Sequence, residues 1–175
     1  MKKIAIPMMV LLLVGVSPAW AWVLGTLVDE YGDATTKKYI QTEAIGTFSN
    51  SATRDSFLKV EVIVDQENHV GVFLHEYSPD RSPVYFTGSG VMMAKNSTGK
   101  TFKTQSIGRW SQTGGISLIN DRSAFISFLR NSNSEIKVVV HDEYSSTYNF
   151  TISAYGFATE YDKMKPQPQN KPKTN

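Results

Sequence analysis

Residues 57–77 read FLKVEVIVDQENHVGVFLHEY, and this stretch carries the clearest structural signal in the chain. Over residues 57–64 apolar side chains alternate with charged ones, a period of two that is typical of a strand with one face in water. Residues 65–68 (DQEN) predict a turn, because short polar side chains hydrogen-bond readily to nearby backbone groups. Residues 69–77 then return as a second apolar strand. The stretch therefore predicts an antiparallel β-hairpin.

Strand patterns recur on both sides of this hairpin, separated by segments rich in glycine, proline and short polar residues. The further predicted strands are residues 38–48, 84–95, 101–110, 116–119, 135–141 and 148–155. One helix is predicted at Asp121–Arg130, with an apolar face and with Asn120-Asp121 as its N-cap. A helical turn is possible at Phe157 to Met164. About eight short strands with one short α-helix predict a mainly β protein, an antiparallel β-sandwich, with a barrel as the alternative.

The first 21 residues have the pattern of a cleavable secretory signal peptide. Lys2 and Lys3 form a positive start, residues 4–16 are largely apolar, and Ser17-Pro18-Ala19-Trp20-Ala21 supplies a helix break followed by small residues at the cleavage site. The apolar stretch is shorter than the ~20 residues that span a bilayer. We therefore expect cleavage after Ala21, a periplasmic or secreted protein, and no stable membrane anchor.

The chain divides into a signal peptide at residues 1–21, a single domain at 22–164 and a tail at 165–175. From Pro166 onward the tail holds Pro, Gln, Asn and Lys with no large apolar side chain, which predicts disorder. The 154 residues that follow the signal peptide form a typical single-domain length.

Charge and cysteine content exclude several classes of function. The chain has 18 Lys and Arg, 16 Asp and Glu, and no cysteine. Loss of the signal peptide removes two lysines and brings the formal net charge from +2 to 0. A neutral surface has no general attraction for nucleic acid or anionic lipid, so neither is expected as a partner. The lack of cysteine excludes disulfides, thiolate metal sites and cysteine nucleophiles.

Residues 94–101, AKNSTGKT, match a relaxed phosphate-binding loop if alanine replaces its first glycine. Phosphate binding requires such a loop between a strand and a helix, whose N-terminus helps to hold the phosphate. Here the following residues, 101–104, alternate as a strand does. We therefore predict a polar hairpin turn and no cofactor at this position.

Two strand ends carry similar polar sequences, His75-Glu76-Tyr77-Ser78 and His141-Asp142-Glu143-Tyr144-Ser145. Imidazole and carboxylate groups could bind a divalent metal if the two ends lay side by side, but neither has the helical spacing of histidine metal motifs. Solvated strand ends are the favoured interpretation. The chain also lacks a Gly-x-Ser-x-Gly nucleophile elbow. We assign no catalytic, cofactor-binding or metal residues and expect a protein that is not an enzyme.

Two tryptophans could either pack on the core or line a recognition groove. They are Trp22, at the expected mature N-terminus, and Trp110, beside Arg109. Core packing is the favoured interpretation, because isolated aromatic residues in strands usually serve it.

The order of several aromatic and glycine motifs resembles a known family. The motifs are Trp22-Val23 followed by Asp29, the alternating hairpin, Arg109-Trp110-Ser111, the helix with Phe125, Ile126, Phe128 and Leu129, and the closing stretch Tyr148 to Phe157. Together they resemble the exported VasI/TagO-like proteins associated with type VI secretion, which also occur in phages and prophages. The closing strand and glycine are also similar to invasion-associated locus B proteins. The resemblance implies a periplasmic β-sandwich with an accessory or binding role, and it transfers no functional residue.

These observations lead to two functional hypotheses. The first is a periplasmic, non-catalytic accessory or binding protein that presents a sheet edge or loops to a protein partner in the cell envelope. The alternative is a secreted hydrolase or an inhibitor of a cell-wall enzyme. An enzyme should show a concave pocket in which titratable groups converge, whereas a binding protein should show an exposed apolar surface.

Overall fold

The computed structural model describes residues 21–28, 31, 33–86, 89–105, 107–111 and 114–165. The predicted signal peptide up to residue 20 and the predicted tail from Pro166 lie outside the described residues. The described residues form ten strands and two helices. These are β1 Val23–Val28, β2 Ala34–Ser49, β3 Ser56–Asp65, β4 Val70–Glu76, β5 Gly90–Asn96, β6 Thr101–Thr104, β7 Ile107–Ser111, β8 Gly114–Leu118, α1 Arg122–Arg130, β9 Glu135–Asp142, β10 Thr147–Ser153 and α2 Phe157–Met164.

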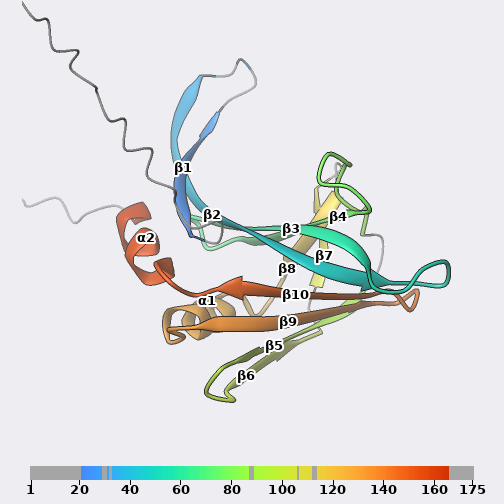
Figure 1. Ribbon diagram of the computed structural model, residues 1–175. Coiled ribbons are helices and arrows are strands. Elements are labelled where there is room, and N and C mark those ends of the chain that lie inside the picture. The colour runs from blue at the N-terminus through green and yellow to red at the C-terminus, as the bar shows by residue number, and fades with distance from the viewer. Residues whose placement is uncertain are drawn as a thin grey trace, which may run out of the picture.

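All ten strands belong to one antiparallel sheet (Figure 1). Its order is β6-β5-β9-β10-β2-β3-β4-β8-β7, with β1 paired to β2 outside this path. The mainly β prediction is confirmed, and the number of strands is ten where about eight were predicted.

The sheet curls until its two edges nearly meet. Strands β6 and β7 lie at opposite edges, yet they are consecutive pieces of one run of chain that bends between Thr104 and Ile107. A side chain at Gly90 of β5 would come within 2.8 Å of Ile107, so the start of β7 touches the far half of the sheet. A strand that bends in this way turns a corner of the sheet and nearly closes it into a barrel. The bend explains why the single strand predicted at 101–110 is found as two.

The predicted hairpin is confirmed as β3 and β4. Their register places Val60 opposite Leu74 and Val62 opposite Val72, and these side chains are buried. The intervening side chains of β3, such as Lys59 and Glu61, are partly exposed. The period-two pattern therefore separates the core face from the wet face as expected.

One predicted strand boundary is wrong, and one strand was missed. The strand predicted at 84–95 begins only at Gly90. Residues 84–86 form no strand, and the Val84 N–H donates to the Leu74 carbonyl of β4. Strand β1 was not predicted at all. Its sequence, VLGTLV, has no alternation to indicate a strand.

Both helices pack at one end of the curled sheet. On α1, Phe125 contacts Phe102 of β6, with ring centroids 5.1 Å apart, and Phe128 and Leu129 are also buried. Asp121 stands at the N-cap position, as predicted. Its carboxylate, however, accepts a hydrogen bond from the Thr104 hydroxyl and caps no backbone N–H. The possible turn at 157–164 is a full second helix, α2, where one helix was predicted.

Lys165 belongs to the folded domain, although the predicted tail begins with it. Its ammonium group donates to the Gln66 carbonyl at 2.7 Å and to the Asn68 side chain at 2.6 Å, and it lies over the ring of Tyr161. Lys165 therefore packs on the turn after β3 and on α2. Within the described part of the chain, no helix has the length and apolar character needed to cross a membrane.

Strand β1 and the first part of β2 form an arm that projects from the body (Figure 1). In the arm, residues 34–38 of β2 pair only with β1, whereas residues 39–48 pair with β3. Leu27 and Val28 near the tip are exposed. The arm is thus held to the rest of the sheet mainly by the second half of β2.

Candidate functional site

Three loops gather at the end of the sheet opposite the helices. Strands β9, β2 and β4 alternate with their neighbours in the antiparallel order, so all three run in the same direction. The described residues that follow them, 143–146, 50–55 and 77–86, therefore emerge at the same end. We call it the loop end.

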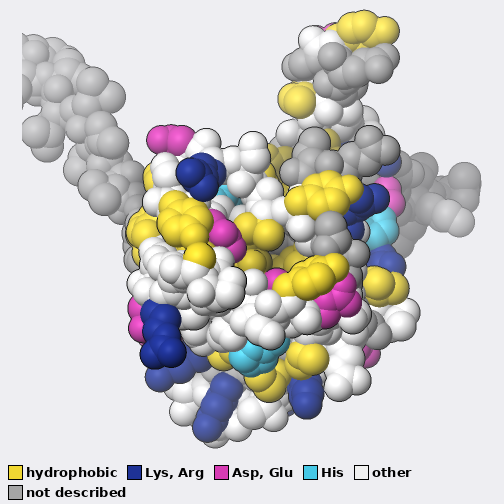
Figure 2. Space-filling model, turned by 90° about the vertical axis from the view of Figure 1, so that its right-hand side faces the viewer, with side chains coloured by type: hydrophobic (Ala, Val, Ile, Leu, Met, Phe, Trp, Pro, Cys, Tyr) yellow, Lys and Arg dark blue, Asp and Glu magenta, His cyan; other side chains and the backbone are white. Residues whose placement is uncertain are grey.

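Exposed tyrosines mark the loop end. Tyr77 and Tyr85 in the loop after β4 are 46% and 50% exposed, and Tyr144 after β9 is 68% exposed. We call these three residues the tyrosine surface. Figure 2 looks onto this end and shows separate hydrophobic side chains standing among basic and acidic ones. Tyrosine is suited to recognition because it offers a large rigid ring and a polar hydroxyl at low entropic cost.

Arginine side chains lie over two of these rings. Arg81 lies over Tyr77 at 5.2 Å from the ring centroid, and Arg109 lies over Tyr85 at 4.9 Å. The Arg109 guanidinium also donates to the Tyr85 hydroxyl. Such cation–π contacts contribute about 0.5–1 kcal/mol at exposed sites and hold a ring in one orientation. Two of the three tyrosines are therefore arranged before any partner arrives.

Tyr77 is held in an unusual backbone conformation. Its φ of 66° is left-handed, which is rare for a bulky residue. Its N–H donates to the Phe57 carbonyl at 3.0 Å, and its ring meets the buried ring of Phe48 edge-on at 4.8 Å. Strained residues of this kind concentrate at functional sites.

Glu143 joins two of the loops beside the tyrosine surface. Its carboxylate accepts hydrogen bonds from both the backbone N–H and the hydroxyl of Ser89, each at 3.3 Å. The Ser89 N–H, followed by a hydrogen bond from Tyr144, lowers the pKa of Glu143 from its ordinary value of 4.5. Glu143, Tyr85 and Tyr144 also line a hollow of about 30 Å³, room for one water molecule.

His75, one of the predicted strand-end residues, fixes the loop from below. It is only 8% exposed, and its Nδ1 donates to the Arg81 carbonyl at 2.6 Å. Its Nε2 is buried without a hydrogen-bond partner, and a Glu61 oxygen lies 3.7 Å away. The favoured interpretation of a solvated strand end is therefore wrong for His75, which is a buried tie between β4 and the loop.

His141 lies elsewhere on the same face of the sheet. Its Nδ1 is 3.0 Å from the Thr147 hydroxyl, and strands β10, β2 and β3 separate its strand from that of His75. The two histidines, which the metal hypothesis required to be neighbours, are not brought together. No three His, Asp or Glu side chains are grouped to hold a metal ion in the described ranges.

The hairpin turn predicted at residues 94–101 is confirmed. It joins β5 to β6, and no helix follows it. The buried Asn96 side chain organises the turn, accepting from the Lys100 N–H at 3.0 Å and donating to the Ser132 hydroxyl at 3.1 Å. Gly99 supplies the left-handed position, with φ +85°. The helix N-terminus that phosphate binding requires does not follow this loop.

Trp22 packs in the core, as predicted, whereas Trp110 is only partly buried and lies outside the core cluster. Trp22 is 4% exposed, and its indole N–H donates to the Ser153 carbonyl at 2.8 Å. Trp110 on β7 meets Phe73 of β4 with ring centroids 5.9 Å apart.

One partly buried carboxylate, Glu76, faces the interior at the loop end. The Tyr148 hydroxyl donates to Glu76 at 3.0 Å. Burial, and then the negative charge of Glu76, raise the pKa of Tyr148 well above its ordinary value of 10. This pair closes the core below the loops.

The tyrosine surface was not predicted from the sequence. A signal was present, because Tyr-Ser follows both similar strand ends. Only the strand order shows that these ends lie at one end of the molecule. No protein-family model, curated protein or solved structure matches this chain.

Proposed function

We propose that this is a periplasmic, non-catalytic accessory protein that binds an envelope protein partner through the tyrosine surface. The observation that carries the proposal is the group of three exposed tyrosines on loops at one end, two of them stacked by arginines. Tyrosine and arginine are the residues most enriched at the energetic centres of protein interfaces.

The anchoring of the loops supports the same proposal. His75 ties the Tyr77–Tyr85 loop to β4, and Glu143 ties the Tyr144 turn to Ser89. A surface that is already ordered loses less entropy on binding. A partner would therefore meet a preformed surface.

The distribution of titratable groups favours binding over the alternative of a secreted hydrolase. The pocket of about 620 Å³ beside β10 contains a single carboxylate, Glu135, and hydrolysis requires several polar groups that converge. An inhibitor of a cell-wall enzyme would also bind its target through these loops. In that case the inhibited enzyme would be the envelope partner proposed here.

The most specific form of this proposal follows from the resemblance to VasI/TagO-like proteins of type VI secretion and prophages. In that form the protein is an accessory protein of the same kind. A β-sandwich remains the proposed finer architecture. It would serve the function equally well as a barrel, because loops gather at the ends of the strands in both.

Site-specific photo-crosslinking tests the proposal. A photoreactive phenylalanine analogue replaces Tyr85 or Tyr144 in cells, and a matched control replaces Ile119, which is 49% exposed at the other end of β8. Irradiation should attach the same envelope protein at positions 85 and 144 and not at 119. Purified partner should then bind Arg109→Ala at least about thirtyfold more weakly, since interface hot spots contribute about 2 kcal/mol or more.

Two results would contradict the proposal. One is equal crosslinking at all three positions, which would indicate random collision. The other is a partner that binds the Arg109→Ala and Tyr144→Ala proteins as tightly as the wild type.

A further inference from the structure

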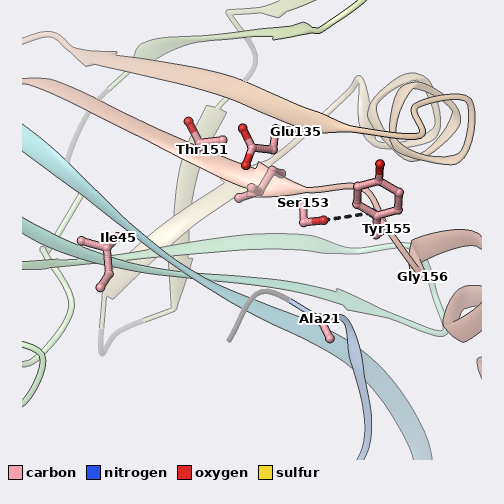
Figure 3. Close-up of a pocket in the computed structure, with 8 residues that line it drawn as sticks. Ala21, Ile45, Glu135, Thr151, Ser153, Tyr155 and Gly156 are labelled. Atoms are coloured by element: carbon pink, nitrogen blue, oxygen red, sulfur yellow. Dashed lines mark hydrogen bonds between the residues drawn. The ribbon is translucent and has the colours of Figure 1, made fainter. Parts of the chain in front are cut away.

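A second site lies where β10 separates from β2. Strand β10 pairs with β2 from Ser49 to Gly46. Strand β1 pairs with the same side of β2 from Gln41 back to Ala34. Residues 43–45 of β2 therefore have no strand on this side. We call this opening the strand gap. Figure 3 shows it bounded by β10 on one side and by β2 and Ala21 on the other.

The strand gap is a cavity of about 620 Å³, within the ~300–1,000 Å³ range typical of ligand pockets. Its wall is mostly apolar. The residues that line it are Ala21, Ile45, Glu135, Thr151, Ile152, Ser153, Tyr155 and Gly156. Ile45 and Tyr155 are among the most exposed large apolar side chains of the protein. An apolar hollow with such exposed walls is typical of an interaction site.

Trp22 packs beside the strand gap, next to the end of β10. Its indole is buried, donates to the Ser153 carbonyl and packs edge-on against Phe157 at 4.8 Å. An indole in this position keeps the end of β10 from continuing along β2. The opening is therefore built into the fold by a buried side chain.

The backbone of β2 offers hydrogen bonds to an occupant. Alternate residues of a strand direct their N–H and C=O groups to the same side. On one side of residues 43–45 these groups pair with β3, and on the other they face the gap. An extended peptide is the ligand that satisfies such groups, as in other cases of strand addition.

Glu135 supplies charge selectivity at the rim. It is exposed at the start of β9, on the face it shares with Ser153, and it makes no ion pair with any described residue. Lys137, the next residue on this face of β9, forms no ion pair with it. An unpaired carboxylate beside an apolar hollow favours a ligand that combines an apolar group with a cation.

We propose that the strand gap binds an extended peptide that inserts one apolar side chain and places a lysine or arginine beside Glu135. This is a second binding site, distinct from the tyrosine surface at the other end of the sheet, and its test is independent of the envelope partner. Ala21 forms part of the wall, so cleavage after this residue would widen the gap and leave the amino group of Trp22 at its rim.

Two matched peptides test the proposal, acetyl-Thr-Val-Leu-Lys-Thr-amide and the same peptide with Glu in place of Lys. Each is titrated into protein expressed from the full-length coding sequence, with the N-terminus determined by mass spectrometry and amide shifts followed by NMR. The lysine peptide should shift Ile45, Thr151 and Ser153. In wild-type protein it should bind about two- to fivefold more tightly than the glutamate peptide, the range expected of an exposed ion pair.

Variants separate the apolar contribution from the charge. Glu135→Gln should abolish the preference for lysine and keep the apolar contact. Thr151→Trp should fill the gap and prevent binding of both peptides, and Tyr155→Ser is a second gap variant in case Thr151→Trp does not fold. The matched controls are Glu67→Gln, an exposed acid on another turn, and Thr101→Trp, on an exposed strand face.

The proposal is overturned if neither peptide shifts the gap residues. It is also overturned if Thr151→Trp and Thr101→Trp bind equally well, or if the shifts fall on Tyr85 and Tyr144. Loss of crosslinking at the tyrosine surface would leave these titrations unchanged, so the two proposals can fail separately.

Discussion

The histidine at position 75 shows how one side chain can organise a surface that it does not reach. It takes the Arg81 carbonyl as the partner for Nδ1, while Nε2 stays buried near Glu61. Glu61 is itself held by Lys59 at 3.0 Å, a contact that raises the pKa of the lysine. The loop that carries Tyr77 and Tyr85 is thus connected through His75 to the charged face of β3.

Replacing His75 with alanine should loosen this loop. The Arg81 carbonyl would lose its donor, and because Arg81 is exposed the net loss of this hydrogen bond costs about 0.5–1.5 kcal/mol in the free energy of unfolding. Urea unfolding measures the cost, and limited proteolysis should cut within residues 77–86 sooner than in the wild type. The control is His141→Ala, expected to stay within about 0.5 kcal/mol. Equal effects of the two substitutions would contradict the role of His75.

Tyr148 predicts how stability changes in alkali. Because burial and Glu76 raise its pKa in the folded state, the folded protein keeps this proton when the unfolded chain has lost it. The resulting stability is fully present below about pH 10, the ordinary tyrosine value, and is lost as pH rises beyond it. Urea unfolding between about pH 9 and 11 should show that the free energy of unfolding falls less steeply with pH for Tyr148→Phe than for the wild type. Tyr144→Phe, at an exposed position, should follow the wild type.

At the scale of elements, Gly46 marks the last residue at which β2 and β10 are paired. A side-chain carbon here would lie 2.1 Å from the Asn149 carbonyl oxygen and 2.7 Å from the Phe150 Cβ. Gly46→Ala should therefore push the strands apart and cost about 1–3 kcal/mol, as overpacking does. Chemical unfolding measures this value. Gly99→Asn is the control, because that turn is open and asparagine accepts a left-handed φ. A Gly46→Ala protein as stable as the control would contradict the close approach.

The elements that the sequence predicted best are those whose pattern is local. Alternation over residues 57–64 was sufficient for β3, and the apolar face of residues 121–130 for α1. Strand β1 escaped prediction because VLGTLV shows no alternation of apolar and polar residues. It is a strand because β2 extends beyond β3 and leaves an unpaired edge to which β1 bonds. The bend between Thr104 and Ile107 depends on which partner each half finds, β5 or β8, and no local pattern contains that information.

The candidate sites were harder to predict for the same reason. Tyr77 and Tyr144 are far apart in the chain, and they share one end of the molecule only through the strand order. The strand gap depends on the place where β10 leaves β2, a tertiary event set by the packing of Trp22. Residue types suited to recognition were visible in the sequence, whereas their grouping was not.

Across the whole molecule, stability should be lowest in the arm. Residues 34–38 of β2 pair only with β1, while residues of β3 are bonded on both sides over a buried core. Backbone amides exchange fastest where local unfolding costs the least free energy, which is where few buried contacts and hydrogen bonds hold the segment. Hydrogen exchange followed by mass spectrometry should therefore show the arm exchanging well before β3. Protection of the arm equal to that of β3 would indicate that a further contact covers it.

The burial of Trp22 has a consequence for the order in which the chain is cleaved and folds. A protease takes its substrate as an extended segment on both sides of the bond that it cuts. If the chain is processed after Ala21, the residue that must enter the protease is the one whose indole lies locked against Ser153 and Phe157. Processing and folding then compete for the same residue, and removal of the leader has to come first. A precursor allowed to fold beforehand should resist signal peptidase, whereas the same precursor in urea should be cut. Because folding buries the first residue of the mature protein, cleavage would have to come after export and before folding is complete.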